Sequence, residues 1–216
     1  MNEQKISEAV IRRLPQYDRY LRELERLGIT RISSGELGKR MGLTASQIRQ
    51  DINCFGALGQ QGYGYNVQEL KNYIEQVLGL SEPHSMVIVG AGNLGRAVCN
   101  YPGFTRRGIT PIALFDRNED LIGTRVGELT VQSMEDFVPF IKAHPASIGV
   151  IATPRQTAQQ VADLMVAGGV RAIWNFAPLD LKLPENVAVN NVHLTDSLLV
   201  LTYRLRVLTD KEKENL

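Results

Sequence analysis

A glycine-rich turn carries the clearest chemical signal in the sequence. It reads Gly90-Ala91-Gly92-Asn93-Leu94-Gly95, and it lies between an apolar stretch at residues 86–89 and a helical pattern. In that setting the first glycine permits a tight turn, the second lets the backbone approach a pyrophosphate, and the third allows close helix–strand packing. The helix N-terminus then presents free N–H groups and a positive dipole end to the phosphates. The turn therefore predicts noncovalent binding of a dinucleotide.

A carboxylate follows the turn at the sequence spacing that a dinucleotide site requires. Asp116 directly follows the second predicted strand, 21 residues after Gly95. It would accept hydrogen bonds from an adenosine ribose and repel a 2′-phosphate, so it favours NAD(H). The neighbouring Arg117 would soften that preference. The alternative is a glycine-lined turn in an empty α/β sheet, which the alignment of strand, helix and acid disfavours.

Groups that handle protons in a hydride-transfer enzyme are scarce in this chain. It has three histidines, His84, His144 and His193, and no Tyr is followed four residues later by Lys. About a hundred residues follow Asp116, and the nucleotide fold consumes most of them. We therefore expect no catalytic residue and no enzymatic activity. A small NAD-dependent dehydrogenase with a helical appendage is the second interpretation, and a CoA-binding module is the third.

A second group of residues has the side chains of a DNA reader. Thr44 and Gln47 form a capping box that opens a helix to about Phe55, and Ser33 and Glu36 open the helix before it. One face of the later helix carries Ile48, Ile52 and Phe55 and should pack inward. The opposite face, which suits base edges and phosphates, carries Ser46, Arg49, Gln50 and Asn53. Asp51 is expected to form a salt bridge or a cap.

A glycine-rich stretch at residues 56–64, with Tyr63 and Tyr65, suits a tight β-hairpin after this helix. Two helices followed by such a hairpin predict a winged helix–turn–helix, in which Gln61 and Tyr63 would be DNA contacts of the wing. Around it, basic side chains for phosphate contacts are Arg31, Lys39 and Arg40. A helical cap that covers the sheet or forms a dimer, beside a vestigial cofactor site, is the alternative.

The remaining elements follow from periodicity. Residues 5–27 are predicted to be helical, with Pro15 as a possible break, and a helix at 67–77 precedes a linker at 79–84 that contains His84. Strands are predicted at 86–89, 111–115, 148–152 and 170–174, and helices at 134–143, 154–167 and 195–208. The predicted fold is α/β: a winged helix–turn–helix domain over residues 1–79, a Rossmann-like, doubly wound parallel sheet over residues 85–194, and a C-terminal segment, 195–216.

Composition fits an ordinary globular protein of 216 residues, with 44% hydrophobic residues and a net charge of +1. The near-neutral charge averages +2 over residues 1–80 and −1 over the rest, so it does not exclude nucleic acid. Two cysteines, Cys54 and Cys99, are too few for a disulfide framework and wrongly spaced for zinc. No apolar run has the length of a membrane span. We expect a cytoplasmic protein with neither a metal site nor a membrane anchor.

The combination of these motifs resembles the Rex family of redox-sensing transcriptional repressors over essentially the whole chain. The residues that carry the resemblance are Ser46-Gln47-Ile48-Arg49-Gln50-Asp51, Phe55-Gly56-x-x-Gly59, Gly62-x-Gly64-Tyr65, Gly90–Gly95, Asn100-Tyr101-Pro102-Gly103-Phe104, Phe115-Asp116, Thr153-Pro154 and Asn175-Phe176-Ala177-Pro178.

The resemblance implies a homodimer whose C-terminal helix swaps into the partner, and a palindromic, AT-rich operator. It implies that NADH closes the dimer and releases double-stranded DNA, whereas the NAD-bound or empty repressor binds it. Tyr101 matches the tyrosine near the nicotinamide. The loops that line the cofactor cleft match Thr153, Pro154, Asn175 and Phe176. Arg19, Tyr101 and His193 match the redox-switch contact.

Three positions depart from the family pattern. Gln50 stands where the family usually has Lys, and Gln61 stands where the wing commonly carries Arg. The loss of two cations should weaken phosphate contacts, so we expect a weaker or altered operator preference. His193 stands where some members have Asp, and a histidine does not reproduce a carboxylate–Arg pair. One hypothesis is that His193 makes the NADH response depend on pH between about pH 5 and 8.

Overall fold

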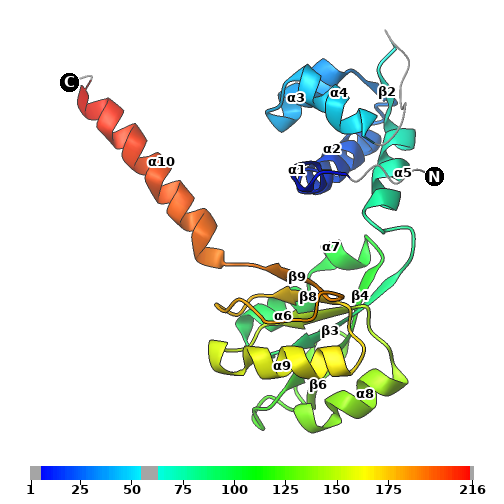
Figure 1. Cartoon of the computed structure of the whole chain (residues 1–216), viewed down its shortest axis with the longest axis vertical. Coiled ribbons are helices and arrows are strands. Elements are labelled where there is room, and N and C mark those ends of the chain that lie inside the picture. Colours follow the sequence, from blue (N-terminus) through cyan, green and yellow to red (C-terminus); the bar gives the residue numbers. More distant parts are fainter. Residues whose placement is uncertain (1–5, 55–62, 215–216) are drawn as a thin grey trace. The chain divides into compact units, whose positions relative to one another are not determined.

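The computed structural model describes residues 6–54 and 63–214, without the side chain of residue 214. The chain divides into two compact units, Met1–Glu82 and Pro83–Leu216. The boundary falls in the segment that the sequence predicts as a linker. Each unit has its own hydrophobic core. Figure 1 shows the helices and strands of both units.

The first unit is a small helical bundle with a two-stranded sheet. Its helices are α1 (Glu8–Ile11), α2 (Leu14–Arg26), α3 (Ser34–Met41), α4 (Ala45–Asn53) and α5 (Val67–Val77). Pro15 lies in the first turn of α2, where its missing N–H costs no helical hydrogen bond. The helical stretch expected over residues 5–27 is therefore divided into two helices, and the second begins at Leu14, one residue before Pro15.

The core of this unit contains one face of each long helix. Its largest fully buried side chains are Tyr17, Leu14, Leu21, Leu24, Leu37, Ile48, Ile52, Leu70 and Ile74. The helical spacing of these residues in the sequence is what directs them inward. Packing of α2 against α5, and of α3 against α4, sets the position of the predicted DNA reader.

The glycine-rich hairpin falls mostly outside the described residues, which resume at Tyr63. The strand that follows, β2 (Tyr65–Asn66), pairs antiparallel with β1 (Arg31–Ile32). The strand β1 was not predicted, because a strand of two residues shows no alternating pattern. At Gly64 the chain has φ +70°, and a Cβ there would lie 2.6 Å from the Ile32 carbonyl oxygen. This close approach requires glycine.

The second unit contains a seven-stranded sheet in the order β5-β6-β4-β3-β7-β8-β9. All neighbours are parallel except β5 and β6. The strands are β3 (His84–Val89), β4 (Ile109–Asp116), β5 (Arg125–Val126), β6 (Leu129–Ser133), β7 (Ile148–Ile151), β8 (Ala172–Asn175) and β9 (Ala188–Asn191). The strand order reverses between β3 and β7, which makes this the topological switch point of the sheet.

Helices cover both faces of this sheet. Val87 and Val89 of β3 pack in one cluster with residues of α8 (Phe137–Ala143) and α9 (Arg155–Ala167). Met86 and Ile88 belong to the cluster on the other face, with residues of α6 (Asn93–Cys99) and α7 (Pro102–Thr105). A short 3₁₀ turn, η1 (Met134–Asp136), precedes α8. The predicted α/β class with a doubly wound, mainly parallel sheet is confirmed.

Several predicted bounds were wrong. His84 is the first residue of β3 rather than part of the linker, because its N–H donates to the Gly108 carbonyl at 2.8 Å. The strands β5, β6 and β9 and the short helix α7 were not predicted, since they are short or polar. The C-terminal helix α10 spans Leu194–Glu214, beyond the predicted 195–208. In the described part of the chain, no helix is both long enough and apolar enough to cross a membrane.

Candidate functional site

A cavity of about 680 Å³ opens where β3, β4, β7 and β8 end. This is the edge of an open α/β sheet, beside its switch point, where ligands of this fold bind. The predicted cofactor residues that line it are Gly90, Gly92, Leu94, Asp116, Arg117, Thr153, Pro154 and Phe176. Residues that follow four separate strands in the sequence therefore meet at one site.

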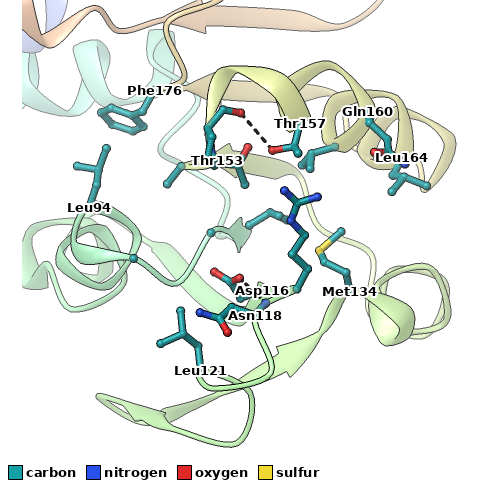
Figure 2. Close-up of a pocket in the computed structure, with 17 residues that line it drawn as sticks. Leu94, Asp116, Asn118, Leu121, Met134, Thr153, Thr157, Gln160, Leu164 and Phe176 are labelled. Atoms are coloured by element: carbon teal, nitrogen blue, oxygen red, sulfur yellow. Dashed lines mark hydrogen bonds between the residues drawn. The ribbon is translucent and has the colours of Figure 1, made fainter.

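Figure 2 shows how the two sides of the cavity differ. Asp116, Asn118 and Leu121 lie on one side, on β4 and the loop after it. Across from them lie Thr157, Gln160 and Leu164, which all come from α9. One side, built from the end of β4 and the loop after it, therefore faces α9 across the cavity.

The glycine turn is held by the carboxylate that the sequence associated with it. The Ala91 N–H donates to Asp116 Oδ2 at 2.6 Å, and the Asn118 N–H donates to Oδ1 at 2.9 Å. Gly90 has φ +106°, and a Cβ there would lie 2.5 Å from the Ala152 carbonyl oxygen. These contacts orient Asp116 at the cavity wall, and its carboxylate oxygens can still accept bonds from ribose hydroxyls.

Gly92 is different, because the fold leaves room for a side chain there. A Cβ at Gly92 would meet no described atom within 4 Å, and the backbone is in the ordinary extended region. The fold itself therefore does not require glycine at this position. The position lines the cavity as the N-cap of α6, so the space fits a group that approaches the backbone closely, as a pyrophosphate does.

A buried hydroxyl in the cavity wall lacks a partner. Within the described residues, Thr153 Oγ1 is one of two buried side-chain polar atoms with no hydrogen-bond partner. Such a group costs free energy unless something satisfies it, so it calls for an explanation. A polar ligand in the cavity would satisfy it. Together with the space at Gly92, this hydroxyl fits a dinucleotide.

The other predicted cofactor residues do not line the cavity. Ala91, Asn93 and Gly95 belong to the turn, and a Cβ at Gly95 would overlap the Gly90 carbonyl oxygen. Tyr101 is exposed and packs edge-on against Phe104, with ring centroids 4.8 Å apart.

Asn175, another predicted cofactor residue, is fully buried. Its Nδ2 donates to the Leu179 carbonyl oxygen at 2.7 Å and to Asn191 Oδ1 at 2.8 Å, and its Oδ1 accepts from the Ala177 N–H at 3.0 Å. The side chain therefore supports the loop that begins with Phe176 rather than facing the cavity.

The three predicted switch residues are divided between the two units. Arg19 is exposed on α2, and its guanidinium lies 5.3 Å from the ring centroid of Tyr20. His193 precedes α10, and its Nε2 lies 3.7 Å from Asp180 Oδ1. Tyr101 lies in the second unit. A contact among Arg19, Tyr101 and His193 stays a prediction.

The sequence analysis missed the residues of the cavity wall that no motif marks. These are Asn118, Leu121, Met134, Thr157, Gln160, Val161 and Leu164. The α9 residues of the wall recur at the three- and four-residue spacing of one helical face, so their periodicity could have identified them. They are Thr157, Gln160, Val161 and Leu164. Asn118 and Leu121 come from the loop after β4, and Met134 comes from the short turn η1, where spacing carries no such signal.

Exposure on α4 follows the predicted division into two faces. Ser46, Gln47, Arg49, Gln50 and Asn53 are exposed, whereas Ile48 and Ile52 are buried. Phe55, expected on the inner face, and Gln61 of the wing lie outside the described residues. Tyr63 is 70% exposed, and its carbonyl oxygen accepts from Arg31 Nη1 at 3.3 Å. The described part of the predicted reader thus presents its polar side chains outward.

Both predicted capping boxes are confirmed. Ser33 Oγ accepts from the Glu36 N–H at 3.1 Å, and Thr44 Oγ1 accepts from the Gln47 N–H at 3.2 Å. Gln47 Oε1 accepts in return from the Thr44 N–H at 3.0 Å, so its amide oxygen is engaged in the cap. Only the amide nitrogen of Gln47 remains for a DNA contact.

Asp51 forms the salt bridge that the sequence analysis expected, and it is almost fully buried. Arg13 Nε and Nη2 each donate to a different Asp51 oxygen at 2.7 Å, and the Tyr17 hydroxyl donates to Oδ2 at 2.9 Å. The hydrogen bond to Asp51 raises the pKa of Arg13, and burial raises the pKa of Tyr17 well above its usual value. Three groups from two segments therefore fix how α4 is rotated about its axis.

Two family models match the two units. Residues 5–53 match the model described as putative DNA-binding protein N-terminus, and residues 81–179 match the model described as CoA binding domain. The second match covers the glycine turn and Asp116. This match is also what the CoA-binding interpretation of the sequence predicts.

Whole-chain relatives narrow the family. The chain is 52% identical to the redox-sensing transcriptional repressor Rex of Clostridium botulinum (strain Alaska E43 / Type E3), over 93% of this chain and 95% of the relative. It also resembles RSP, a Rex-family repressor, with a TM-score of 0.89 and 46% identity over 98% of this chain and 99% of that one.

RSP has also been solved with bound ligands. Its complex with β-NADH has a TM-score of 0.88 and 45% identity to this chain, over 97% of this chain and 99% of that one. Its complex with β-NAD+ and operator DNA also has a TM-score of 0.88, with 48% identity over 97% of both chains. These relatives are repressors rather than enzymes, which removes the dehydrogenase interpretation. The chain belongs to the Rex family of redox-sensing transcriptional repressors.

Proposed function

We propose that this chain binds operator DNA when it is empty or holds NAD, and that NADH releases it. The observation that carries the proposal is the cavity, whose turn leaves space at Gly92 and whose Thr153 hydroxyl lacks a partner. The same chain exposes a row of polar side chains on α4. A ligand site and a reading surface on one chain are what a ligand-controlled repressor needs.

The proposed cofactor residues fall into three groups. The turn would hold the pyrophosphate, Asp116 and Arg117 the adenosine end, and the loops after β7 and β8 the nicotinamide end. In the order of the chain, they are Gly90, Ala91, Gly92, Asn93, Leu94, Gly95, Tyr101, Asp116, Arg117, Thr153, Pro154, Asn175 and Phe176. Asn175 would act indirectly, by supporting the loop that carries Phe176.

The dinucleotide supplies a nicotinamide ring whose charge and shape depend on its redox state. The protein performs no chemistry on it and needs only to bind the two forms unequally. NADH can drive release only through a higher affinity for the conformation that does not bind DNA. A dinucleotide with equal affinity for both conformations would shift nothing, however tightly it bound. The proposed device for unequal binding is the contact among Arg19, Tyr101 and His193.

The proposed DNA contacts lie on α4 and the wing: Ser46, Gln47, Arg49, Gln50, Asn53, Gln61 and Tyr63. A helix of this kind reads base edges in the major groove, and a two-fold dimer reads a palindrome. An AT-rich sequence suits the amide side chains of Gln50 and Asn53, because Gln and Asn pair with adenine. This function places the protein in the cytoplasm, where bacterial DNA and the dinucleotide pool meet.

The C-terminal helix supports the proposed homodimer. Leu194, Leu198, Leu201, Leu205 and Leu208 of α10 are each more than half exposed. Their spacing alternates between four and three residues, which is the pattern of a helix that packs along another surface. Apolar exposure on this scale marks an interaction surface. We infer that a second copy of the chain covers it, with α10 exchanged between the two.

A gel-shift titration tests the proposal. A palindromic AT-rich duplex is mixed with the full-length protein, and NADH and NAD are added in separate series. Release by NADH at concentrations where NAD has no effect is the expected result. Equal release by both dinucleotides, or no binding to the duplex even at low salt, would contradict it. A duplex with one half-site scrambled is the control for palindromic recognition.

A further inference from the structure

Arg96 of α6 lies outside the cavity wall, yet it bonds two segments whose other residues line the cavity. Its Nε donates to the Ala91 carbonyl oxygen at 2.8 Å, and its Nη2 donates to Thr124 Oγ1 at 3.1 Å. Ala91 belongs to the glycine turn, and Thr124 belongs to the loop that follows β4. The half-buried guanidinium therefore bridges two segments that are separated by about 30 residues.

The bridge belongs to a connected set of hydrogen bonds around one end of the cavity. The Thr124 hydroxyl donates to the Leu121 carbonyl oxygen at 2.6 Å, and Leu121 lines the cavity. On the other side, the N–H of Ala91 donates to Asp116 Oδ2, and the N–H of Asn118 donates to Oδ1. Arg96 thus holds the carbonyl of the same residue whose N–H is held by Asp116.

We infer that Arg96 is a positioning residue for the adenosine–pyrophosphate half of the dinucleotide. This inference rests on the proposed function. The planar guanidinium fits the arrangement because it donates to two acceptors in fixed directions, whereas a lysine ammonium has no such fork. It keeps the glycine turn and the 117–124 loop at a constant separation, so that the phosphate and ribose contacts are formed together before the ligand arrives.

The position of Arg96 predicts which ligands depend on it. NADH, NAD and ADP share the adenosine and pyrophosphate groups, whereas only the first two have a nicotinamide. Loss of Arg96 should therefore weaken the binding of all three by a similar factor, about tenfold, as expected when a charged hydrogen bond is removed. The ratio of the NADH and NAD affinities should not change. NADH should still release DNA, but only at about ten times the concentration.

The experiment measures the dissociation constants of ADP, NADH and NAD by calorimetry for the wild type, Arg96→Gln and Thr124→Val. The two substitutions remove opposite ends of one bridge, so their effects on ADP binding should be less than additive in the double variant. Thr124→Ser retains the hydroxyl and should restore wild-type affinity. Arg107→Gln is the matched control, because Arg107 is also half-buried and donates to a carbonyl four residues away, that of Gly103 at 3.1 Å.

The unfolding temperature of each variant without ligand separates positioning from general support of the fold. A lower unfolding temperature with unchanged ADP affinity would overturn the inference, and so would a loss of NADH binding that leaves ADP binding intact. If Arg96→Gln does not fold, Thr124→Val and Thr124→Ser decide the matter through the same ADP measurement. If the wild type binds none of the three ligands, the proposed function fails first, and the inference fails with it.

Discussion

The cofactor cavity and the exposed face of α4 are built from different parts of the chain. The cavity depends mainly on backbone: a glycine turn, two N–H groups on Asp116, and the ends of four parallel strands. The face of α4 depends on side chains, which project from a helix that caps and a buried ion pair hold in place. The course of the backbone therefore defines the cavity, whereas exposed side chains on a helix of fixed position define the face of α4.

The difference indicates which changes each site tolerates. A side chain added to the cavity turn alters the shape that every ligand meets, so its effects should be large and general. A side chain exchanged on the outer face of α4 alters one contact and leaves the support intact, so its effects should be smaller and specific to DNA sequence.

Gly90→Ala should destabilise the second unit, whereas Gly92→Ala should not. The first places a Cβ 2.5 Å from the Ala152 carbonyl oxygen at a positive φ, which should lower the free energy of unfolding by about 3 kcal/mol. The second enters open space, so stability should stay within about 0.5 kcal/mol while dinucleotide affinity falls at least about tenfold. Denaturant unfolding and calorimetry measure the two. Unchanged dinucleotide binding in Gly92→Ala would show that nothing approaches the turn.

Asp51→Ala should damage the support of the reading face without touching its outer side chains. It leaves Arg13 without its partner, and since the Arg13 side chain is 27% exposed, we expect a loss of about 2 kcal/mol in stability. DNA affinity should fall, and ADP affinity should not. The control is Glu8→Ala, which breaks the exposed pair with Arg12 and should cost less than about 1 kcal/mol. Equal costs for the two variants would mean that burial of Asp51 adds nothing.

Gln50→Lys should change the electrostatics of DNA binding and little else. One added cation on each recognition helix should steepen the dependence of log affinity on log salt by about 0.9 per helix. Stability should stay the same, because Gln50 is exposed. Affinity measurements at several salt concentrations test this. Gln159→Lys is a poor control, because Gln159 Oε1 and Nε2 both bond the backbone of Lys182. The control is therefore Gln156→Lys, which adds a cation at an exposed position on α9.

His193→Ala should have the smallest effect, confined to the pH dependence of the NADH response. His193 Nε2 faces Asp180 Oδ1, and this pair is attractive only when the imidazole is protonated. We expect the NADH concentration for DNA release to depend on pH in the wild type and to depend less on pH in the variant. A flat response in the wild type would remove the hypothesis, and Asp180→Asn should reproduce the variant if the pair is responsible.

The sequence was sufficient to predict most features that involve residues close together in the chain. The capping boxes at Ser33 and Thr44 involve partners three residues apart, and the glycine turn is a run of six residues, so short spacing was sufficient. Asp51 and Arg13 are 38 residues apart, and Arg96 and Thr124 are 28 apart. No periodicity connects such pairs, because tertiary packing alone brings them together. For that reason the salt bridge of Asp51 was predicted without its partner, and Arg96 was not predicted at all.

Asn175 illustrates a different limit. The sequence places a polar side chain just after a strand, at the edge where ligands bind, and such a residue can face either the ligand or its own loop. In the structure it satisfies the carbonyl of Leu179 and the N–H of Ala177. The choice depends on the unpaired backbone groups that the next few residues leave behind. Residue type and position alone do not contain that information.

The exposed leucines of α10, which the proposed dimer would bury, would make DNA binding depend on the concentration of the repressor. In the proposed dimer a second copy buries this surface and links folding to association, so the unfolding temperature should rise with protein concentration. Two reading helices would then be available together only above a threshold abundance. At low copy number the proposed dimer would dissociate and leave the operator without NADH, so repression would depend on the amount of this protein as well as on the proposed response to NADH.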